Sequence, residues 1–311
     1  MSKNVLIIDE MHPSLTNLLQ QAGFNTNYAP QITRAEILAI LPAYHVLIVR
    51  SKTPIDAELI HRAAALQVVA RAGAGTDQID IAALQARNIA LINAPEGNRD
   101  AVGEHAVGML LALMNKLLQA DCQVRQKIWD REANRGYELM NKTVGIIGYG
   151  NTGQAFAQKL SGFGCRVLAY DKYKSGFSDT YAAEATLEQL WAEAEILSLH
   201  IPLTAETRGW VNESFFDKFI HPVWFINTAR GEIAPLAAIR AALQSGKLRG
   251  ACLDVLEQEK LDQLTPAQAA DFEWLTQQNN VLFSPHVAGW TYESYERINR
   301  VLVEKLVRLT G

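Results

Sequence analysis

The feature that most constrains the fold of this chain is a glycine-rich hexapeptide in the middle of the sequence: Gly148-Tyr149-Gly150-Asn151-Thr152-Gly153. It follows an apolar, strand-like run at residues 143–147 and opens a helix-like run at residues 154–160. In such a unit Gly148 would make the tight turn, Gly150 would let the backbone approach a pyrophosphate, and Gly153 would let the helix pack closely against the strand. The amino end of that helix would present free N–H groups and the positive end of its dipole to the phosphates.

An acidic residue at a suitable distance supports this interpretation. A second apolar run at residues 166–170 is followed by Asp171, which lies 23 positions after Gly148. An acid about 20 positions after the first glycine binds the ribose 2′-hydroxyl in dinucleotide-binding units. A glycine-rich hexapeptide alone also fits an ordinary turn. Strand, helix, strand and acid in this order predict a dinucleotide-binding site.

Length and composition exclude several other classes of protein. The 311 residues suffice for two domains, and 49% apolar with 20% charged residues is typical of a globular chain. A net charge of −4 gives no basic footprint for nucleic acid, no secretory signal is apparent, and no apolar run approaches the ~18 residues of a membrane helix. Cys122, Cys165 and Cys252 are scattered, and no metal-ligand spacing occurs. We therefore expect a cytoplasmic protein without a metal and without nucleic-acid or membrane partners.

Strand-like and helix-like runs alternate along the whole chain, which predicts parallel sheets covered by helices on both faces. Before the hexapeptide, the candidate strands are residues 5–9, 46–50, 68–72 and 89–93, and the candidate helices are 15–22, 35–41, 57–65 and 81–87. Four strands are too many for a simple extension of a nucleotide-binding sheet. They indicate a separate, smaller α/β domain.

The later part of the chain continues the alternation after an interruption at residues 95–98. Residues 101–127 predict one long helix, and the candidate elements after the hexapeptide are strands at 196–200, 223–229, 250–254 and 281–284 and a final helix at 292–309. We predict an α/β fold with two doubly wound parallel-sheet domains. A Rossmann nucleotide domain (98–284) is inserted into a flavodoxin-like substrate domain (1–97 and 285–311), with the ligand site in the cleft between them.

Three residues near predicted strand ends could perform chemistry beside a nicotinamide, which supplies hydride but needs a proton donor and a substrate anchor from the protein. Arg230 ends a strand-like run and could grip a carboxylate or carbonyl in a two-pronged manner, although a surface salt bridge is the alternative. His286 follows the last strand, and histidine suits proton transfer at neutral pH. Taken by itself, Glu259 is expected to be an acid in a solvated loop.

Several motifs together resemble the D-isomer-specific 2-hydroxyacid dehydrogenase family. Three signatures carry the resemblance: Asn227-Thr228-Ala229-Arg230-Gly231, Asp254-Val255-Leu256-Glu257-Gln258-Glu259 and Ser284-Pro285-His286-Val287-Ala288-Gly289. Further similar motifs lie at residues 49–53, 71–77, 93–98, 102–106 and 200–204, so the resemblance covers nearly the whole chain. Within the family, the chain resembles in particular short members similar to D-3-phosphoglycerate dehydrogenase.

The resemblance implies a mechanism. His286 would be the acid/base at C2, Glu259 would hold its imidazole, and Arg230 would bind and polarise the substrate. Backbone N–H groups near Ala74 and Gly75 would take the substrate carboxylate. Hydride and proton would pass between a 2-hydroxy acid and its 2-oxo acid. The implied partners are this small molecule and a second copy of the chain, in a homodimer formed through the helix at 101–127.

The resemblance also implies two sets of ligand contacts. Asp171 would select NAD over NADP because a 2′-phosphate would face its carboxylate, while Lys172 and Lys174 leave NADP as the alternative. The expected cofactor contacts are Gly148, Tyr149, Gly150, Asn151, Thr152, Gly153, Asp171, His200, Pro202, Thr204, Thr228, Ala229, Asp254 and Gly289. The expected substrate contacts are Arg50, Ser51, Lys52, Ala74, Gly75, Asn98 and Trp290.

Three positions depart from the family pattern. Lys260 replaces a common proline, so the loop carrying Glu259 could run differently. Residues 234–236 replace the usual acidic pair, and Trp290 is bulkier than the small residue of phosphoglycerate dehydrogenases. Trp290 could line the pocket or serve packing.

The nature of the substrate stays open between several acids. Arg50 and Lys52 could meet a phosphate, which favours D-3-phosphoglycerate and a place in serine biosynthesis; their alternative is an ordinary solvated loop. Glycerate–hydroxypyruvate or glyoxylate reduction is the enzymatic alternative, and Glu259 in place of glutamine argues against formate dehydrogenase. An NAD(H)-sensing corepressor that binds partner proteins is the alternative of another class. The sequence leaves the direction of the reaction and the exact oligomer undecided.

Overall fold

The computed structural model describes residues 3–310 and divides into two compact units. The first unit comprises Met1–Arg99 and Trp290–Gly311, and the second comprises Asp100–Gly289. These divisions lie two and five residues after the boundaries expected from the sequence. Residues 285–289 therefore belong to the second unit, because the N–H groups of Val287 and Ala288 are hydrogen-bonded to the carboxylate of Asp254 there.

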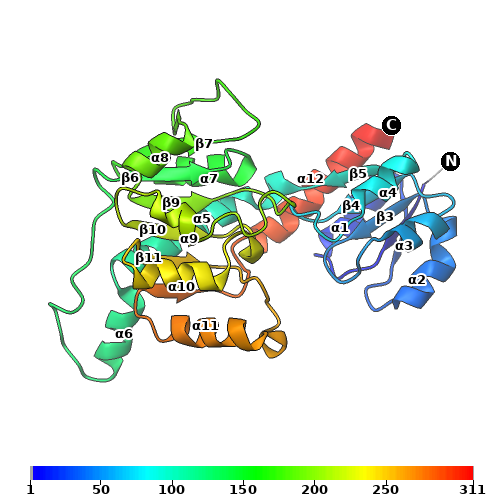
Figure 1. Cartoon of the computed structure of the whole chain (residues 1–311). Helices are drawn as coiled ribbons and strands as arrows, with labels where there is room; N and C mark the ends of the chain where they lie inside the picture. Colours follow the sequence, from blue (N-terminus) through cyan, green and yellow to red (C-terminus); the bar gives the residue numbers. More distant parts are fainter. Residues whose placement is uncertain (1–2, 311) are drawn as a thin grey trace. The chain divides into compact units, whose positions relative to one another are not determined.

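The first unit contains a five-stranded parallel sheet with the order β2-β1-β3-β4-β5 (Figure 1). Its strands are β1 (Asn4–Ile7), β2 (Asn25–Tyr28), β3 (Val46–Val49), β4 (Val68–Arg71) and β5 (Ala90–Asn93). This is the flavodoxin-like order, so the predicted fold of this unit is confirmed. The sequence analysis missed β2, because this edge strand consists of polar residues and one tyrosine and is mostly exposed.

Helices cover both faces of the first sheet, as expected for a doubly wound fold. They are α1 (Ser14–Gln21), α2 (Arg34–Ile40), α3 (Ala57–Arg62), α4 (Ile81–Ala86) and α12 (Tyr292–Thr310), with a 3₁₀ turn η1 (Leu41–Ala43). Side chains alternate between the faces of β1: Val5 and Ile7 pack with α1 and α12, whereas Leu6 and Ile8 pack with the α2–α4 side. The final helix of the chain thus completes the core of the first unit.

The second unit contains a seven-stranded parallel sheet with the order β12-β11-β10-β9-β6-β7-β8 (Figure 1). Its strands are β6 (Thr143–Ile147), β7 (Arg166–Tyr170), β8 (Ala183–Glu184), β9 (Ile196–Leu199), β10 (Val223–Asn227), β11 (Leu248–Leu253) and β12 (Val281–Phe283). The chain moves outward from β6 in one direction and then returns to β9 on its other side. This reversal of strand order is the topological switch point of a Rossmann sheet, so the predicted fold class is confirmed.

Helices also cover both faces of the second sheet. They are α5 (Pro95–Met114, which begins in the first unit), α6 (Leu117–Arg125), α7 (Asn151–Leu160), α8 (Leu187–Glu193), α9 (Glu213–Asp217), α10 (Leu236–Gln244) and α11 (Pro266–Thr276), with 3₁₀ turns η2 (Gly231–Ile233) and η3 (Leu261–Gln263). Residues of α5 and α7 share one core cluster, and residues of α8, α9 and α10 share the other. The carboxyl ends of β6, β9, β10 and β11 open onto one edge of this sandwich.

The single long helix expected at residues 101–127 is a wrong prediction. The helix begins at Pro95, where the fixed φ of proline suits a first helical turn, and it ends at Met114. Lys116 adopts a left-handed conformation with φ of 52°, and α6 continues at an angle of 59° to α5. Within residues 3–310 no single helix is long and apolar enough to cross a membrane, although this bent pair meets the criterion together by length and composition only.

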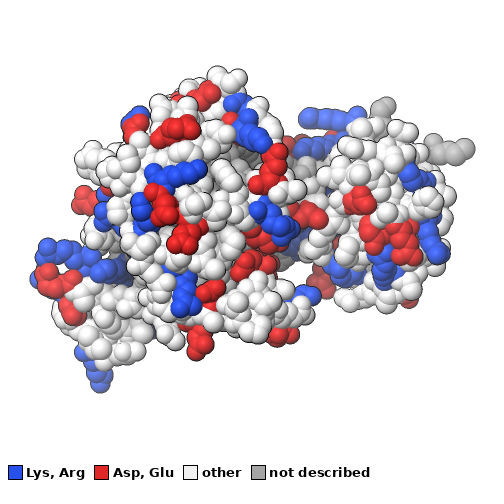
Figure 2. Space-filling model, viewed as in Figure 1, with Lys and Arg blue, Asp and Glu red and all other residues white. Residues whose placement is uncertain are grey.

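Charged side chains of both signs are interspersed on the visible face of each unit (Figure 2). Several of them form ion pairs within a unit, such as Arg34 with Asp56 at 2.7 Å and Arg240 with Asp271 at 3.0 Å.

Gly97 tests how tightly the start of α5 packs on α12 within the first unit. A Cβ at Gly97 would lie 2.6 Å from the Cα of Ile298, so we expect Gly97→Ala to lower the free energy of unfolding by about 1–3 kcal/mol. Gly108→Ala is the control on the same helix, since a Cβ there meets no described atom within 4 Å, and alanine should stabilise by about 0.5–1 kcal/mol. Urea denaturation of both variants measures the difference; equal effects would contradict the close approach.

Candidate active site

The three glycines of the hexapeptide have different surroundings. Gly148 follows β6 with φ of +93°, and a Cβ there would lie 2.5 Å from the carbonyl oxygen of His200. A Cβ on Gly153 would collide with the carbonyl oxygen of Gly148. A Cβ on Gly150 would meet no atom of residues 3–310 within 4 Å. The fold itself therefore requires two of the glycines, and the space beside Gly150 is open to a ligand.

The hexapeptide also leaves the amino end of α7 without a side-chain cap. Gly150 is the residue before the helix, and no side chain in the described part of the chain accepts from the first-turn N–H groups. Asn151 and Thr152 form that first turn and are partly exposed. A ten-residue helix with free amide groups beside an open glycine fits a pyrophosphate.

Tyr149 contributes packing rather than an exposed contact. Its ring is fully buried and stacks on Phe177 at a centroid distance of 5.2 Å. Its hydroxyl donates to the carboxylate of Asp179 at 2.9 Å, and burial together with this carboxylate raises the pKa of Tyr149. The side chain thus anchors the hexapeptide to the loop that follows β7, while its backbone remains at the turn.

Asp171 is fixed beside the hexapeptide at the end of β7. Its carboxylate accepts from the N–H of Tyr149 at 2.9 Å and from the N–H of Tyr173 at 3.0 Å. The two lysines that could oppose it have other partners: Lys172 pairs with Glu206, and Lys174 donates to the carbonyl oxygen of Tyr149 at 2.6 Å. The negative charge of Asp171 is therefore not neutralised by an ion pair with either lysine.

The residues expected beside the nicotinamide lie on the loops that follow β9 and β10. His200 is hydrogen-bonded through Nε2 to Ser198 Oγ at 2.9 Å, and burial lowers the pKa of His200 to about 3, so the ring is neutral at physiological pH. Pro202 and Thr204 are exposed and are joined to Thr207, whose hydroxyl donates to the Pro202 carbonyl at 2.8 Å. These contacts stiffen the loop after β9.

The turn after β10 places Thr228, Ala229 and Arg230. The buried side chain of Asn227 spans this turn, since its amide oxygen accepts from the N–H of Ala229 and its amide nitrogen donates to the Arg230 carbonyl, both at 3.0 Å. The Arg230 guanidinium donates to the Ala229 carbonyl at 2.7 Å. The hydroxyl oxygen of Thr228 is buried and has no hydrogen-bond partner within the described residues. Such an unsatisfied buried group fits a contact to a ligand.

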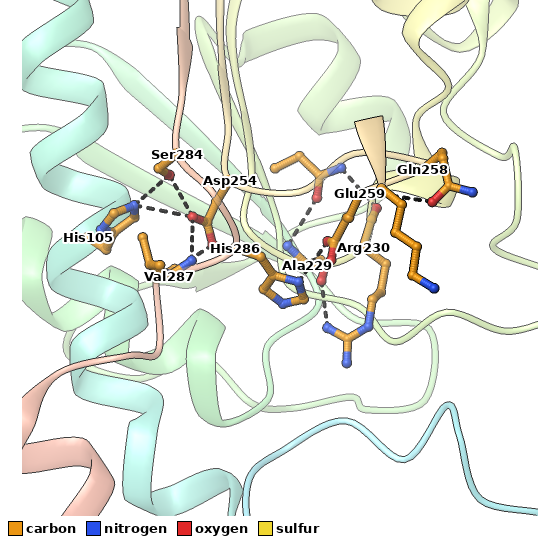
Figure 3. A network of polar contacts seen from close by, with 12 residues as sticks. His105, Ala229, Arg230, Asp254, Gln258, Glu259, Ser284, His286 and Val287 are labelled. Carbon is orange, nitrogen blue, oxygen red and sulfur yellow. Dashed lines mark hydrogen bonds and ion pairs between the residues drawn. The ribbon is translucent and has the colours of Figure 1, made fainter. Parts of the chain in front are cut away.

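His286 and Glu259 form a close pair. Nδ1 of His286 lies 2.7 Å from Oε1 of Glu259, and the side chains are 45% and 49% exposed, so the ring remains accessible. The substitution of Lys260 for a common proline does not prevent this approach; the side chain of Gln258 accepts from the Lys260 N–H at 3.0 Å and bridges Glu259. In Figure 3 the ring of His286 points toward Glu259, and the Arg230 side chain extends to the same side of the view. The pair can hold and transfer a proton.

The backbone of His286 is held by Asp254. His286 has φ of 55°, in the left-handed region, which non-glycine residues seldom adopt. Its N–H donates to the Asp254 carbonyl at 2.7 Å, while the Asp254 carboxylate accepts from Val287 N–H at 2.9 Å and from Ala288 N–H at 3.0 Å. Gly289 ends this segment and the second unit. Asp254, expected as a cofactor contact, is buried, and its carboxylate accepts hydrogen bonds from this loop.

The expected substrate contacts lie in the first unit, around the carboxyl ends of β3 and β4. The Arg50 guanidinium carbon lies 3.4 Å from the centre of the Trp290 ring, and burial lowers the pKa of Arg50. The ammonium of Lys52 donates to the carbonyls of Pro30 at 2.6 Å and Ile32 at 3.0 Å. Trp290 is half-exposed, so it both packs on Arg50 and presents a face to solvent.

The remaining substrate contacts are backbone groups and one amide. Ser51 is exposed, and no hydrogen bond from the N–H of Ala74 or Gly75 is present among residues 3–310. The side-chain oxygen of Asn98 is buried and has no partner in the same range. Both observations suit groups that contact a ligand.

Sequence reasoning missed Asp9, which is buried two residues after the end of β1 and lies at this edge of the first sheet. Its carboxylate accepts from the N–H groups of Arg50 and Lys52. An acid directly after an apolar strand was the available signal. Among the described residues there is no group of three or more His, Cys, Asp or Glu that could hold a metal ion.

Comparisons with known proteins identify the family of this chain. Residues 107–288 match the family model "D-isomer specific 2-hydroxyacid dehydrogenase, NAD binding domain". The chain is 33% identical over 307 residues to a D-3-phosphoglycerate dehydrogenase of Archaeoglobus fulgidus, covering 98% of this chain and 57% of the relative. It is also 33% identical over 307 residues to a hydroxypyruvate reductase of Thermotoga maritima, covering 99% of this chain and 98% of the relative.

A solved structure, D-lactate dehydrogenase from Aquifex aeolicus complexed with NAD and lactic acid, has a TM-score of 0.84 to this chain. It is 24% identical and covers 99% of this chain and 95% of its own, so it supports the fold alone. The chain spans little more than half the length of the phosphoglycerate dehydrogenase from Archaeoglobus.

Asp171 provides a test of cofactor preference. Asp171→Asn keeps an oxygen that can accept from Tyr149 or Tyr173 N–H but removes the charge. We expect the KM for NAD to rise about tenfold and the KM for NADP to fall, because a hydrogen bond to a charged group contributes about 1.5–3 kcal/mol. Steady-state kinetics with both cofactors measure this; Asp217→Asn, at an exposed acid of α9, is the control. An unchanged ratio would show that Asp171 does not select the cofactor.

Proposed function

Because the chain belongs to the D-isomer specific 2-hydroxyacid dehydrogenase family, we propose that it transfers hydride between NAD and C2 of a small D-2-hydroxy or 2-oxo acid. The observation that carries this proposal is the pair of His286 Nδ1 and Glu259 Oε1, 2.7 Å apart. The pair lies in the same unit as the hexapeptide and Arg230. A proton donor, a cation and a dinucleotide site are the three parts that the reaction requires.

The residues around NAD fit this cofactor. The open space at Gly150, the uncapped start of α7 and the unsatisfied hydroxyl of Thr228 are suited to phosphate and amide groups. Asp171 would accept from the ribose hydroxyls, and the neutral ring of His200 would border the nicotinamide. When bound, the cofactor supplies or accepts the hydride.

In the direction of reduction, His286 donates a proton from Nε2 to the carbonyl oxygen of the 2-oxo acid as C2 receives hydride. Nδ1–H of the same ring donates to Glu259, which sets the tautomer and stabilises the protonated ring. Arg230 polarises the carbonyl and holds the carboxylate. The N–H groups of Ala74 and Gly75, which the sequence predicts as carboxylate ligands, belong to the first unit. Oxidation of the hydroxy acid reverses each transfer.

The contacts of the first unit bear on the choice of substrate. Arg50 and Lys52 are the residues expected to meet the phosphate of D-3-phosphoglycerate, but Lys52 is hydrogen-bonded to two carbonyls and Arg50 stacks on Trp290. The shallow cavity of about 280 Å³ beside them is also lined by Asp9 and Glu10. A phosphate there would face two carboxylates. These contacts favour the alternative, an unphosphorylated acid such as glycerate or hydroxypyruvate, or glyoxylate.

The alternative of another class is an NAD(H)-sensing corepressor. A sensor needs the dinucleotide site but has no use for a proton donor held by a carboxylate. The His286–Glu259 pair supplies the proton donor that an enzyme needs, but a sensor could keep the same pair, so turnover of a 2-oxo acid is what separates the two classes.

NADH oxidation with phosphohydroxypyruvate, hydroxypyruvate and glyoxylate tests the proposal. We expect turnover with at least one of them, higher for the two unphosphorylated acids. His286→Ala should lower kcat by about 10²- to 10⁴-fold and retain NADH binding, because it removes the general acid. His221→Ala, at an exposed histidine of the same unit, is the control. Tight NADH binding without turnover of any acid would favour the sensor, and a fully active His286→Ala would contradict the mechanism.

We also propose that the enzyme is a homodimer formed through residues 117–129, which comprise α6 and the segment that follows it (the α6 region). Large apolar side chains are exposed there, including Leu117, Leu118 and Trp129, the last 80% exposed. A cavity of about 420 Å³ between α5, α6 and the edge strand β12 adjoins them.

Sedimentation of the wild type should give about 69 kDa, twice the 34.4 kDa of the chain. Leu118→Glu should shift the mass toward the monomer, because a charge would enter an apolar interface. Ile220→Glu is the control, at an exposed apolar residue outside the α6 region. A monomeric wild type, or a dimeric Leu118→Glu, would contradict this interface.

A further inference from the structure

His105, on α5, contacts the group that holds the catalytic loop, although the mechanism above does not use it. Its Nε2 lies 2.9 Å from Ser284 Oγ and 3.5 Å from Asp254 Oδ1. Both partners belong to the same unit as His105. Figure 3 shows His105, Ser284 and Asp254 in mutual contact, with Val287 and His286 beside Asp254.

The direction of the hydrogen bonds follows from the available protons. Ser284 Oγ lies 2.6 Å from Asp254 Oδ1, and an ionised carboxylate can only accept. The single hydroxyl proton of Ser284 is therefore directed to Asp254, and Ser284 Oγ accepts from Nε2–H of His105. This assigns the proton of the His105 ring to Nε2.

Asp254 stays ionised because of these donors. Burial alone would raise the pKa of Asp254, but hydrogen bonds from Ser284 and the N–H groups of Val287 and Ala288, with His105 close by, hold it below its usual value. A buried carboxylate that lost part of this set would carry a large desolvation cost. The Asp254 carboxylate would then be less firmly oriented toward the N–H groups of Val287 and Ala288.

The same carboxylate and its backbone determine where His286 lies. His286 donates its N–H to the Asp254 carbonyl at 2.7 Å, and its neighbour Val287 donates to Asp254 Oδ1, the atom that Ser284 also contacts. The left-handed backbone of His286, with φ of 55°, persists only if its surroundings enforce it. His105 is linked to Asp254 by two hydrogen bonds in series, one from His105 to Ser284 and one from Ser284 to Asp254.

We propose that His105 is a positioning residue for the reaction, acting on His286 through Ser284 and Asp254. This inference rests on the proposed function of His286. It does not require that His105 touch substrate or cofactor. Its contribution is to fix the Ser284 hydroxyl on Asp254 Oδ1 and so to fix the loop that carries the acid.

Three substitutions on α5 test the proposal. His105→Leu removes the donor, and His105→Gln restores an N–H donor near the position of Nε2. Met109→Leu is the matched control, because Met109 lies one turn further on α5 and its sulfur contacts the same Ser284 Oγ at 3.5 Å. The readouts are kcat with hydroxypyruvate or glyoxylate, KM for the acid, and the Kd of NADH by fluorescence.

We expect His105→Leu to lower kcat about tenfold with the Kd of NADH changed less than about twofold, since a displaced proton donor impairs the chemical step and not cofactor binding. His105→Gln should recover most of the loss, and Met109→Leu should match the wild type. Full activity of His105→Leu overturns the inference. Equal losses in His105→Leu and His105→Gln, or an equal loss in Met109→Leu, also overturn it, because packing alone would then explain the effect.

Two further measurements keep the test decisive. If His105→Leu does not fold, Ser284→Ala breaks the same series of bonds and should give the same loss of kcat; a fully active Ser284→Ala overturns the inference. A wild type without turnover of any tested acid contradicts the proposed function instead. In that case the ring signals of His286 in nuclear magnetic resonance should shift in His105→Leu and not in His105→Gln, and unshifted signals overturn the inference.

Discussion

The loop that carries His286 depends on the buried carboxylate of Asp254. A charge in this position would be costly without partners, and the chain provides a hydroxyl and two backbone N–H groups, with His105 close by. The requirement works in both directions, because the groups that satisfy the carboxylate are thereby held in place. The left-handed backbone of His286 is a consequence of this arrangement. One buried acid thus converts a strand end into a defined loop.

The parallel sheet explains why the other site residues of the second unit gather at one edge. Carboxyl ends of neighbouring parallel strands point the same way, so the loops after β6, β9, β10 and β11 share that edge. Residues more than a hundred positions apart in sequence, such as Gly148 and Glu259, are carried there by topology alone. Local hydrogen bonds then orient the side chains. For example, the Asn227 amide spans the turn that leads to Arg230.

Errors of the sequence analysis have physical causes. The strand β2 was missed because pairing along one edge of the sheet needs no apolar pattern, and Asn25, Thr26 and Asn27 show none. The break between α5 and α6 was missed because apolar spacing continues through Lys116, whose left-handed backbone no pattern reveals. The role of Lys52 as a phosphate ligand stays a prediction, and its hydrogen bonds to Pro30 and Ile32 could not be foreseen because they join a loop to a distant one.

The sequence by itself determined the doubly wound class, the presence of a dinucleotide-binding domain and the family, because glycine spacing, strand periodicity and strand-end motifs are local properties of the chain. Only the tertiary structure decided which side chains are already engaged. It joined His286 to Glu259 and directed the ammonium of Lys52 to a backbone carbonyl. It also placed His105 against Asp254, 149 positions later in the chain. Such contacts arise from packing between distant segments, and hydrogen-bond partners over that range leave no periodic signal in the sequence.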